Sequence, residues 1–454
     1  MAVSSTSAIT HISDSFIKPK YELDELKQPI HVAPLELHML SCEYTQKGFM
    51  FRKPQNTDVE ALLESLKESI SLTITHFYPL GGQLVTQKYE EEDSSSICID
   101  CTKGPGARLI HATIDMSVSD VISPRYVPQV VHSFFDHEGA SACDGHYKSL
   151  LSVQVTELVD GIFMGCSINH MVADGTSYCH FLNVWSEIHR ANGKNISISQ
   201  PPVHKRWFPD GFGPIIKLPV ARPDDYVIRN GTPGVLRERI FHFSSESVAA
   251  LKAKANAECG TKHISSFMAL AAFAWRSITR ARSLPRYWKT TCCFAIDNRQ
   301  RLNPSLSQDY FGSYIQRVVG VTTVGKLLEA SIGSTAMLLQ KAVLDHDDQI
   351  IRNTVKKWME TRVVDQLGGF VDPCGVVLGG SPKFDVYSNE FGLGKAIAVL
   401  SGKNGKSDGK MVALPGWEGG GSIDLEITLS PASMTALESD QEFMQAVTSS
   451  PLKQ

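Results

Sequence analysis

The stretch Ser167-Ile-Asn-His-Met-Val-Ala-Asp-Gly175 places a histidine between an apolar segment and an expected helix. Residues 151–158 alternate apolar and polar side chains, Asp160-Gly161 is a two-residue hairpin signal, and residues 162–168 form a nearly continuous apolar run. Apolar side chains then recur at helical spacing over residues 178–188. The pattern predicts a strand, a loop carrying the histidine, and a helix. In that arrangement a loop side chain can face a cavity.

The candidate general base of this loop is His170. The spacing His-x-x-x-Asp alone is weak evidence, because His111 and His132 begin two further copies of it. His111 falls within an expected strand and His132 within a polar stretch, so we expect both to be packed or solvated histidines. Only His170 stands at a strand exit in front of Asp174 and Gly175. An imidazole at such a position has a pKa suited to proton transfer near neutral pH.

Length and composition favour a protein of two domains. A chain of 454 residues exceeds what one hydrophobic core usually supports. A segment rich in Pro and Gly divides it, so we expect an N-terminal domain at 1–195, a crossover at 196–235 and a C-terminal domain at 236–454. The net charge of −4 indicates no nucleic-acid partner. Without a leader pattern or a long apolar run, we expect a cytoplasmic protein that does not insert into a membrane.

The ten cysteines do not form a recognisable framework, and we expect them to be reduced thiols. Cys98-Ile-Asp-Cys101 has the spacing of half a metal or redox site, but no second Cys or His pair stands at ligand spacing. Cys292-Cys293 lies in an apolar, strand-like run. We therefore predict structural roles for these cysteines and no metal site.

Other segments predict alternating helices and strands. Thr57-Asp-Val-Glu60 has capping-box spacing before a helix that ends ahead of the turn at 78–82. A strand at 236–243 precedes two helical stretches, the second at 266–280, and residues 423–429 alternate as a half-buried strand. The fold class is therefore mixed α/β.

Several of these segments resemble motifs of one enzyme family. His170 to Gly175 is similar to its HxxxDG motif and residues 76–82 to its YPLAGR segment, while residues 266–277 resemble the helix entering its second domain. Residues 297–304 with Tyr310-Phe-Gly resemble its DxRxRxxP…YFGN segment. The chain thus resembles the plant BAHD superfamily of acyl-CoA-dependent acyltransferases over nearly its whole length. The resemblance implies a two-domain chloramphenicol-acetyltransferase-like fold of mixed sheets flanked by helices, with a long interdomain crossover.

The resemblance also implies an activity and the residues that perform it. A monomer would transfer an acyl group from acyl-CoA, a co-substrate, to a hydroxyl or amine of a small metabolite, with no tightly bound cofactor. His170 would be the general base. Asp174 would pair with an arginine to hold the loop or, alternatively, orient the imidazole as in a catalytic triad. Ser381 would be either an oxyanion donor or a turn serine. Donor and acceptor would bind together in a ternary complex; Cys166 and Ser167 would be the first nucleophiles to test if they did not.

Further roles follow for the CoA contacts and for a structural motif. We expect CoA phosphates near a helix start, in contact with four candidate side chains: Lys252, Lys254, Ser265 and Ser266. The family's DFGWG motif is replaced here by Glu390-Phe-Gly-Leu-Gly394. Its structural positions are Glu390, Gly392 and Gly394, and Glu390 could pair with Arg299 or Arg301.

A second departure keeps other functions open. Gly380-Ser-Pro382 stands where the family commonly has Thr-Ser-Trp, a stretch that often helps to hold the oxyanion. One alternative is therefore a lyase on the same scaffold that acts without CoA, as in salicylate formation. Another is a non-catalytic protein that binds a small molecule.

Overall fold

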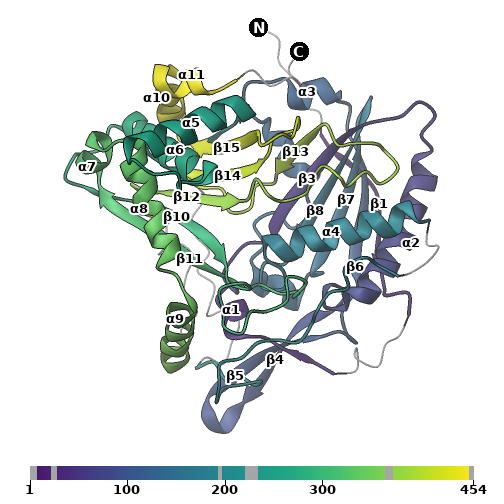
Figure 1. The fold of residues 1–454 in the computed structure, drawn as a ribbon. Helices are drawn as coiled ribbons and strands as arrows, with labels where there is room; N and C mark the ends of the chain where they lie inside the picture. Colours follow the sequence, from purple (N-terminus) through teal and green to yellow (C-terminus); the bar gives the residue numbers. More distant parts are fainter. Residues whose placement is uncertain (1–7, 22–27, 193–196, 220–233, 363–371, 449–454) are drawn as a thin grey trace.

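Two six-stranded mixed sheets lie next to each other and form the framework of the molecule (Figure 1). The computed structural model describes residues 8–21, 28–192, 197–219, 234–362 and 372–448. The expectation of a mixed α/β fold is therefore confirmed.

The first sheet is built mainly from the N-terminal half. Its strand order is β1 (Thr10–Ile17), β6 (Ala107–Thr113), β7 (Leu151–Glu157), β8 (Gly161–Ile168), β3 (Thr45–Arg52) and β13 (Ala398–Ser401). β7 and β8 form the predicted hairpin, in which Leu151 is paired with Ile168. The edge strand β13 comes from far along the chain and pairs antiparallel with β3. The C-terminal half thus completes the N-terminal sheet.

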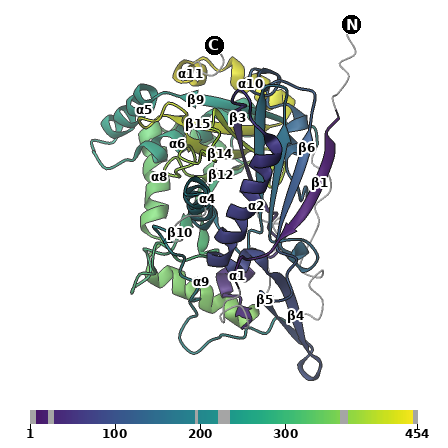
Figure 2. The ribbon, with the colours of Figure 1, turned by 90° about the vertical axis from the view of Figure 1, so that its right-hand side faces the viewer.

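The second sheet contains only strands from the C-terminal half. Its order is β11 (Ile315–Thr323), β10 (Lys289–Asp297), β12 (Val376–Gly380), β14 (Lys410–Pro415), β15 (Ile423–Leu429) and β9 (Arg237–Phe243). β12 lies parallel to both of its neighbours, and the remaining pairs are antiparallel. A third, small sheet has the order β2 (Ile30–His31), β5 (Ser94–Asp100) and β4 (Gln83–Tyr89), and the hairpin of β4 and β5 projects from the molecule (Figure 2).

Helices cover the two large sheets separately. The α-helices are α1 (Pro34–Leu37), α2 (Val59–His76), α3 (Val118–Ile122), α4 (Gly175–Arg190), α5 (Ser245–Glu258), α6 (Ser266–Arg282), α7 (Val324–Glu329), α8 (Ile332–Leu344), α9 (Asp348–Thr361), α10 (Pro431–Ser439) and α11 (Gln441–Ala446). The 3₁₀ helices are η2 (Tyr78–Gly81), η3 (Glu90–Glu92), η4 (Gln129–Phe134) and η5 (Ala142–His146). Residues of α2 and α4 pack with the first sheet, and residues of α5, α6, α8 and α10 pack with the second.

The buried cores show which face of the second sheet meets the first half. Along β14, Met411 and Ala413 belong to the core under α5 and α6. Val412 and Leu414 alternate with them and belong to the core that contains α4 and β8. Because successive side chains of a strand point to opposite faces, Lys410 shares the face of Val412. This face of β14 therefore looks toward the histidine loop.

Most of the expected elements are present, with one local correction. The helix expected after Thr57 is α2, but its N-cap is Asp58, which accepts a hydrogen bond from the amide of Ala61 at 3.1 Å. Thr57 instead donates its hydroxyl to Pro54 O at 2.8 Å. A carboxylate one position later is an equally good acceptor for the first-turn amides, so the helix begins one residue later. Of the predicted crossover, only 197–219 and 234–235 fall within the described residues.

Candidate active site

The histidine loop has the predicted frame. His170 lies in a turn that leaves the buried strand β8 and precedes α4. Asn169, fully buried, fixes the start of the turn by donating to Ala142 O at 2.8 Å and accepting from the amide of Met171 at 3.0 Å. His170 itself remains half-buried, and its Nδ1 has no hydrogen-bond partner among the described residues. The loop thus supports an imidazole that other side chains do not occupy.

Asp174 serves as the anchor of the loop. Its carboxylate is fully buried and faces Arg299, with Nη1 to Oδ2 at 2.8 Å and Nη2 to Oδ1 at 3.1 Å. It also caps α4 by accepting from the amide of Ser177 at 2.9 Å, and it accepts from the amide of Tyr314 at 2.8 Å. Four donors therefore fill both oxygens. The arginine pair implied by the family resemblance is present, and the four donors that occupy both carboxylate oxygens do not include His170.

The electrostatic surroundings keep His170 neutral and Asp174 charged. Burial lowers the pKa of His170, Lys410 adds to this effect, and Asp174 opposes it. Burial would raise the pKa of Asp174, but the charge and hydrogen bonds of Arg299 outweigh it, so the pKa lies below its ordinary value. A neutral imidazole beside a permanently charged anchor is the protonation state that a general base requires.

The second half of the chain brings Ser381 toward this loop. Ser381 follows β12 in a turn, where its hydroxyl oxygen accepts from the amide of Lys383 at 3.2 Å. That contact leaves the hydroxyl hydrogen free to donate. Three residues later, Phe384 packs on the start of α4: a Cβ on Gly175 would lie 2.9 Å from the phenyl ring. Gly175 thus permits the close approach of the Ser381 turn to the histidine loop.

The alternative pairing expected for Glu390 is wrong. Arg299 is fully used by Asp174, Asp297 and nearby backbone carbonyls, and Arg301 donates to Val343 O and His346 O, both at 2.9 Å. Glu390 is exposed. Glu390 forms no ion pair with a described residue, so the expected arginine contact does not hold this segment.

The remainder of the Glu390 segment has a packing role. Phe391 is buried, with its ring centroid 4.4 Å from that of Trp185 in α4. Gly392 and Gly394 both have a positive φ, +74° and +80°, which suits glycine. Leu393, in place of the family's tryptophan, is buried. The segment therefore secures α4, at a distance along the helix from His170.

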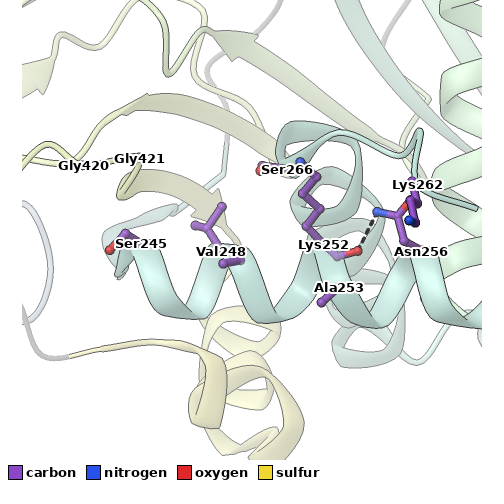
Figure 3. A pocket seen from close by; sticks show the side chains of 10 residues that line it. Ser245, Val248, Lys252, Ala253, Asn256, Lys262, Ser266, Gly420 and Gly421 are labelled. Atoms are coloured by element: carbon purple, nitrogen blue, oxygen red, sulfur yellow. Dashed lines mark hydrogen bonds between the residues drawn. The ribbon is translucent and has the colours of Figure 1, made fainter.

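A groove of about 530 Å³ lies along α5, next to the start of α6 (Figure 3). Lys252 and Ser266 line it, as does Lys262, which the sequence interpretation missed. Ser265 is the N-cap of α6 and accepts from the amide of Met268 at 3.2 Å. Lys254 does not line the groove and lies 3.6 Å from Glu442, so its candidacy as a CoA contact loses support.

The opposite wall of this groove is Gly420-Gly421, part of the Gly416-Trp-Glu-Gly-Gly-Gly segment. Two lysines beside the N-terminus of a 17-residue helix form an arrangement that favours anions, because unpaired amide groups and the helix dipole add to the lysine charges.

Three negative expectations can be compared with the described residues. All ten cysteines are free thiols. Within the described ranges, His, Cys, Asp and Glu side chains form no group of three or more suited to a metal ion. No helix in the same ranges combines the length and apolar character needed to cross a bilayer.

Comparison with known proteins defines the class of this chain. The model of the Transferase family matches residues 7–444. An uncharacterised acetyltransferase of Arabidopsis thaliana is 36% identical over 444 residues, covering 96% of this chain and 99% of the relative. The BAHD acyltransferase DCR of the same plant is 31% identical over 458 residues, covering 95% and 92%. The fold and the relatives together define an acyltransferase.

Solved structures agree on the fold. Vinorine synthase superposes with a TM-score of 0.72 over 98% of this chain and all of its own, at 18% identity. F. sporotrichioides TRI101, complexed with coenzyme A and T-2, superposes with a TM-score of 0.70. The match covers 93% of this chain and 99% of TRI101, also at 18% identity. The chain belongs to the Transferase family of BAHD acyltransferases.

Proposed function

We propose that the protein transfers an acyl group from an acyl-CoA thioester to a hydroxyl or amine of a small metabolite, with His170 as general base. The observation that carries this proposal is the anchored loop: the buried Asp174–Arg299 pair holds the turn, while Nδ1 of His170 has no hydrogen-bond partner among the described residues and burial favours the neutral imidazole. A positioned base of this kind typically contributes about 10²–10⁴-fold to the rate.

The reaction needs no cofactor beyond the thioester. His170 takes the proton from the acceptor as its oxygen or nitrogen attacks the acyl carbon. The carbonyl oxygen becomes an oxyanion, toward which the hydroxyl of Ser381 is a candidate donor. When the intermediate collapses, the C–S bond breaks and the proton on His170 passes to the departing thiolate, giving free CoA and the acylated acceptor.

Direct transfer is favoured because the nucleophiles next to His170 are unsuitable. Cys166 is buried, and burial raises the pKa of its thiol to about 12, so almost no thiolate exists near neutral pH. The hydroxyl of Ser167 is buried and donates to Asp136 O at 2.8 Å. Neither side chain is free to carry the acyl group.

CoA would bind with its phosphates in the groove of Lys252, Lys262 and Ser266. Two ammonium groups and the start of α6 provide the positive potential that phosphates require. The thioester would then extend toward the turn of Ser381 and the loop of His170, so that donor and acceptor meet between the two halves of the chain.

Release of free thiol from acyl-CoA tests the proposal. The protein is incubated with acetyl-, malonyl- and hydroxycinnamoyl-CoA and a panel of small phenols, alcohols and amines, and thiol release and product mass are followed together. His170→Ala should lower the rate at least about 100-fold with an unchanged melting temperature. The matched control is His111→Ala, at another His-x-x-x-Asp copy, which should stay within a few-fold of the wild type.

The alternative functions give different results. Conversion of a substrate without any thioester, still lost in His170→Ala, would contradict acyl transfer and establish a lyase. Binding of ligands and of CoA without turnover, measured by calorimetry, would establish a binding protein.

A further inference from the structure

Two lysines lie beside the histidine loop without a carboxylate partner. Lys47 is in β3, and its Nζ donates to the hydroxyl of Ser401 in the neighbouring strand β13 at 2.5 Å. Lys410 is the first residue of β14, and its Nζ lies 3.3 Å from the position of a Cβ built on Gly379. Both side chains are half-buried. No ion pair to a described residue is found for either.

The two lysines approach the histidine loop from different sheets, and Lys47 is paired in register with Cys166 of β8, the strand that leads into His170. Lys410 is on the face of β14 that looks toward the first half of the chain; it is paired with Val377 of β12, and its Nζ reaches Gly379, two residues before Ser381. It is close enough to His170 to lower the pKa of the imidazole. Lys47 and Lys410 are in turn close enough for Lys410 to lower the pKa of Lys47. The two cations and the base thus border one region.

Among the described residues, no carboxylate forms an ion pair with Lys47 or Lys410. Burial lowers the pKa of Lys47 to about 7, with further contributions from Lys406 and Lys410. Burial also lowers the pKa of Lys410, and Lys406 adds to the effect, while the thiols Cys293 and Cys42 oppose it. No described carboxylate contributes appreciably to either shift.

Lys406 differs from these two lysines because it has carboxylate partners. Its Nζ is 2.9 Å from Glu238 Oε2 and also pairs with Glu426. Asp174, the buried carboxylate of the histidine loop, is paired with Arg299. An ammonium withdrawn from water without a partner is costly. An anion of a bound ligand would therefore supply the counter-charge that Lys47 and Lys410 lack among the described residues.

We propose that Lys47 and Lys410 bind a carboxylate of the substrate beside His170, so that one of the two reacting molecules is a carboxylic acid. The inference rests on the proposed function, since it specifies the substrate class of the same site. A carboxylate suits the site because it is planar and small and accepts hydrogen bonds from two ammonium groups at once. The acid belongs either to the acyl group or to the acceptor.

Binding measurements identify the acid and its source. Calorimetry measures the binding affinity of each acid and its neutral analogue. Succinyl-CoA is compared with butyryl-CoA to test for an acid on the acyl group. The 3- and 4-hydroxybenzoates are compared with the corresponding hydroxybenzamides to test for an acid on the acceptor. In at least one comparison the acid should bind about tenfold more tightly than its neutral analogue, as expected for a charge-assisted contact. Equal affinity of acid and neutral probe in both comparisons would overturn the proposal.

Substitutions test whether the two lysines cause the preference for the acid over its neutral analogue. Lys410→Met and Lys47→Met keep the length of the side chain and should each abolish most of the preference while leaving the affinity for the neutral probe unchanged. Lys410→Arg keeps the charge and should retain it. Lys341→Met, an exposed lysine on α8, is the matched control and should change nothing. A preference that survives in both Met variants, with normal melting curves, would refute the assignment.

A different variant separates this inference from the proposed function. Lys252→Met should weaken binding of CoA itself and leave the acid preference intact. If the wild type neither binds CoA nor releases thiol but still prefers acids, acyl transfer fails while the carboxylate site stands. If thiol release is normal and no acid is preferred, only the carboxylate site fails.

Discussion

Replacing Asp174 by Asn tests whether this carboxylate is an anchor or part of a proton relay. The side chain is fully buried, and its two oxygens accept from two Arg299 nitrogens and from the amides of Ser177 and Tyr314. Asn has one acceptor and one NH₂ group of similar shape. In either orientation its NH₂ faces two donors, so Asp174→Asn loses two hydrogen bonds and the negative charge.

The expected magnitude follows from what Arg299 retains. Breaking a buried ion pair costs about 3–5 kcal/mol, but Asp297 still lies 3.0 Å from Nη1 of Arg299, so we expect the lower limit of about 3 kcal/mol. An unfolding entropy of about 2.1 cal/mol/K per residue over 454 residues gives about 1 kcal/mol/K. The melting temperature should therefore fall by about 3 °C, together with a loss of activity.

Calorimetry or thermal fluorescence measures the shift, with Asp297→Asn as the matched control. Asp297 pairs with the same arginine, but its side chain is 37% exposed, so its loss should cost less than about 1 kcal/mol. An Asp174→Asn protein that melts like the wild type but has lost its activity would refute the anchor role. It would favour a carboxylate that acts directly on His170.

Three further predictions concern pH, kinetics and stability. The pKa of His170 lies below its ordinary value of 6.5, so the rising limb of kcat/KM against pH should have an apparent pKa below 6.5; a midpoint above 7 would contradict a desolvated base flanked by Lys410 and Asp174. Initial-rate plots at varied donor and acceptor should intersect, and parallel lines would require an acyl-enzyme. The pKa of Lys47 is about 7 in the folded protein, against an ordinary value of 10.5. Between these two pH values the folded state binds fewer protons than the unfolded state. The free energy of unfolding should therefore rise with pH in this range by up to about 1.4 kcal/mol per pH unit. Lys47→Met should reduce this slope in denaturation measurements at pH 7.5 and 9.5, and an unchanged slope would exclude Lys47 as its source.

Local patterns predicted the histidine loop well. The hairpin signal at Asp160-Gly161, the apolar run behind it and the helical period beyond Gly175 are each properties of neighbouring residues, and β8, the turn and α4 follow them closely. The same is true of α6 and β15. The helix start at Asp58 differed, because two adjacent residues are both good caps.

Long-range neighbours were beyond such patterns. No local signal shows that β13 pairs with β3, about 350 residues earlier in the chain, or that Phe384 packs on Gly175. Lys47 and Lys410 look like ordinary polar positions on half-buried strands. Their proposed role depends on the folded chain, in which Lys47 lies beside β8 and Lys410 lies on the face of β14 that looks toward the first half.

The position of Lys410 links substrate binding to the strength of the base. In the free protein its ammonium lowers the pKa of His170, which makes the imidazole a weaker base. A bound carboxylate would neutralise this charge in a region of low dielectric, where the effect of one charge on another is large. The pKa of His170 would then rise toward its ordinary value only when the substrate is present. Because Asp174 is already committed to Arg299, the substrate itself becomes the nearest mobile negative charge. The unpaired lysine that destabilises the empty site would thus make the filled site the more reactive one.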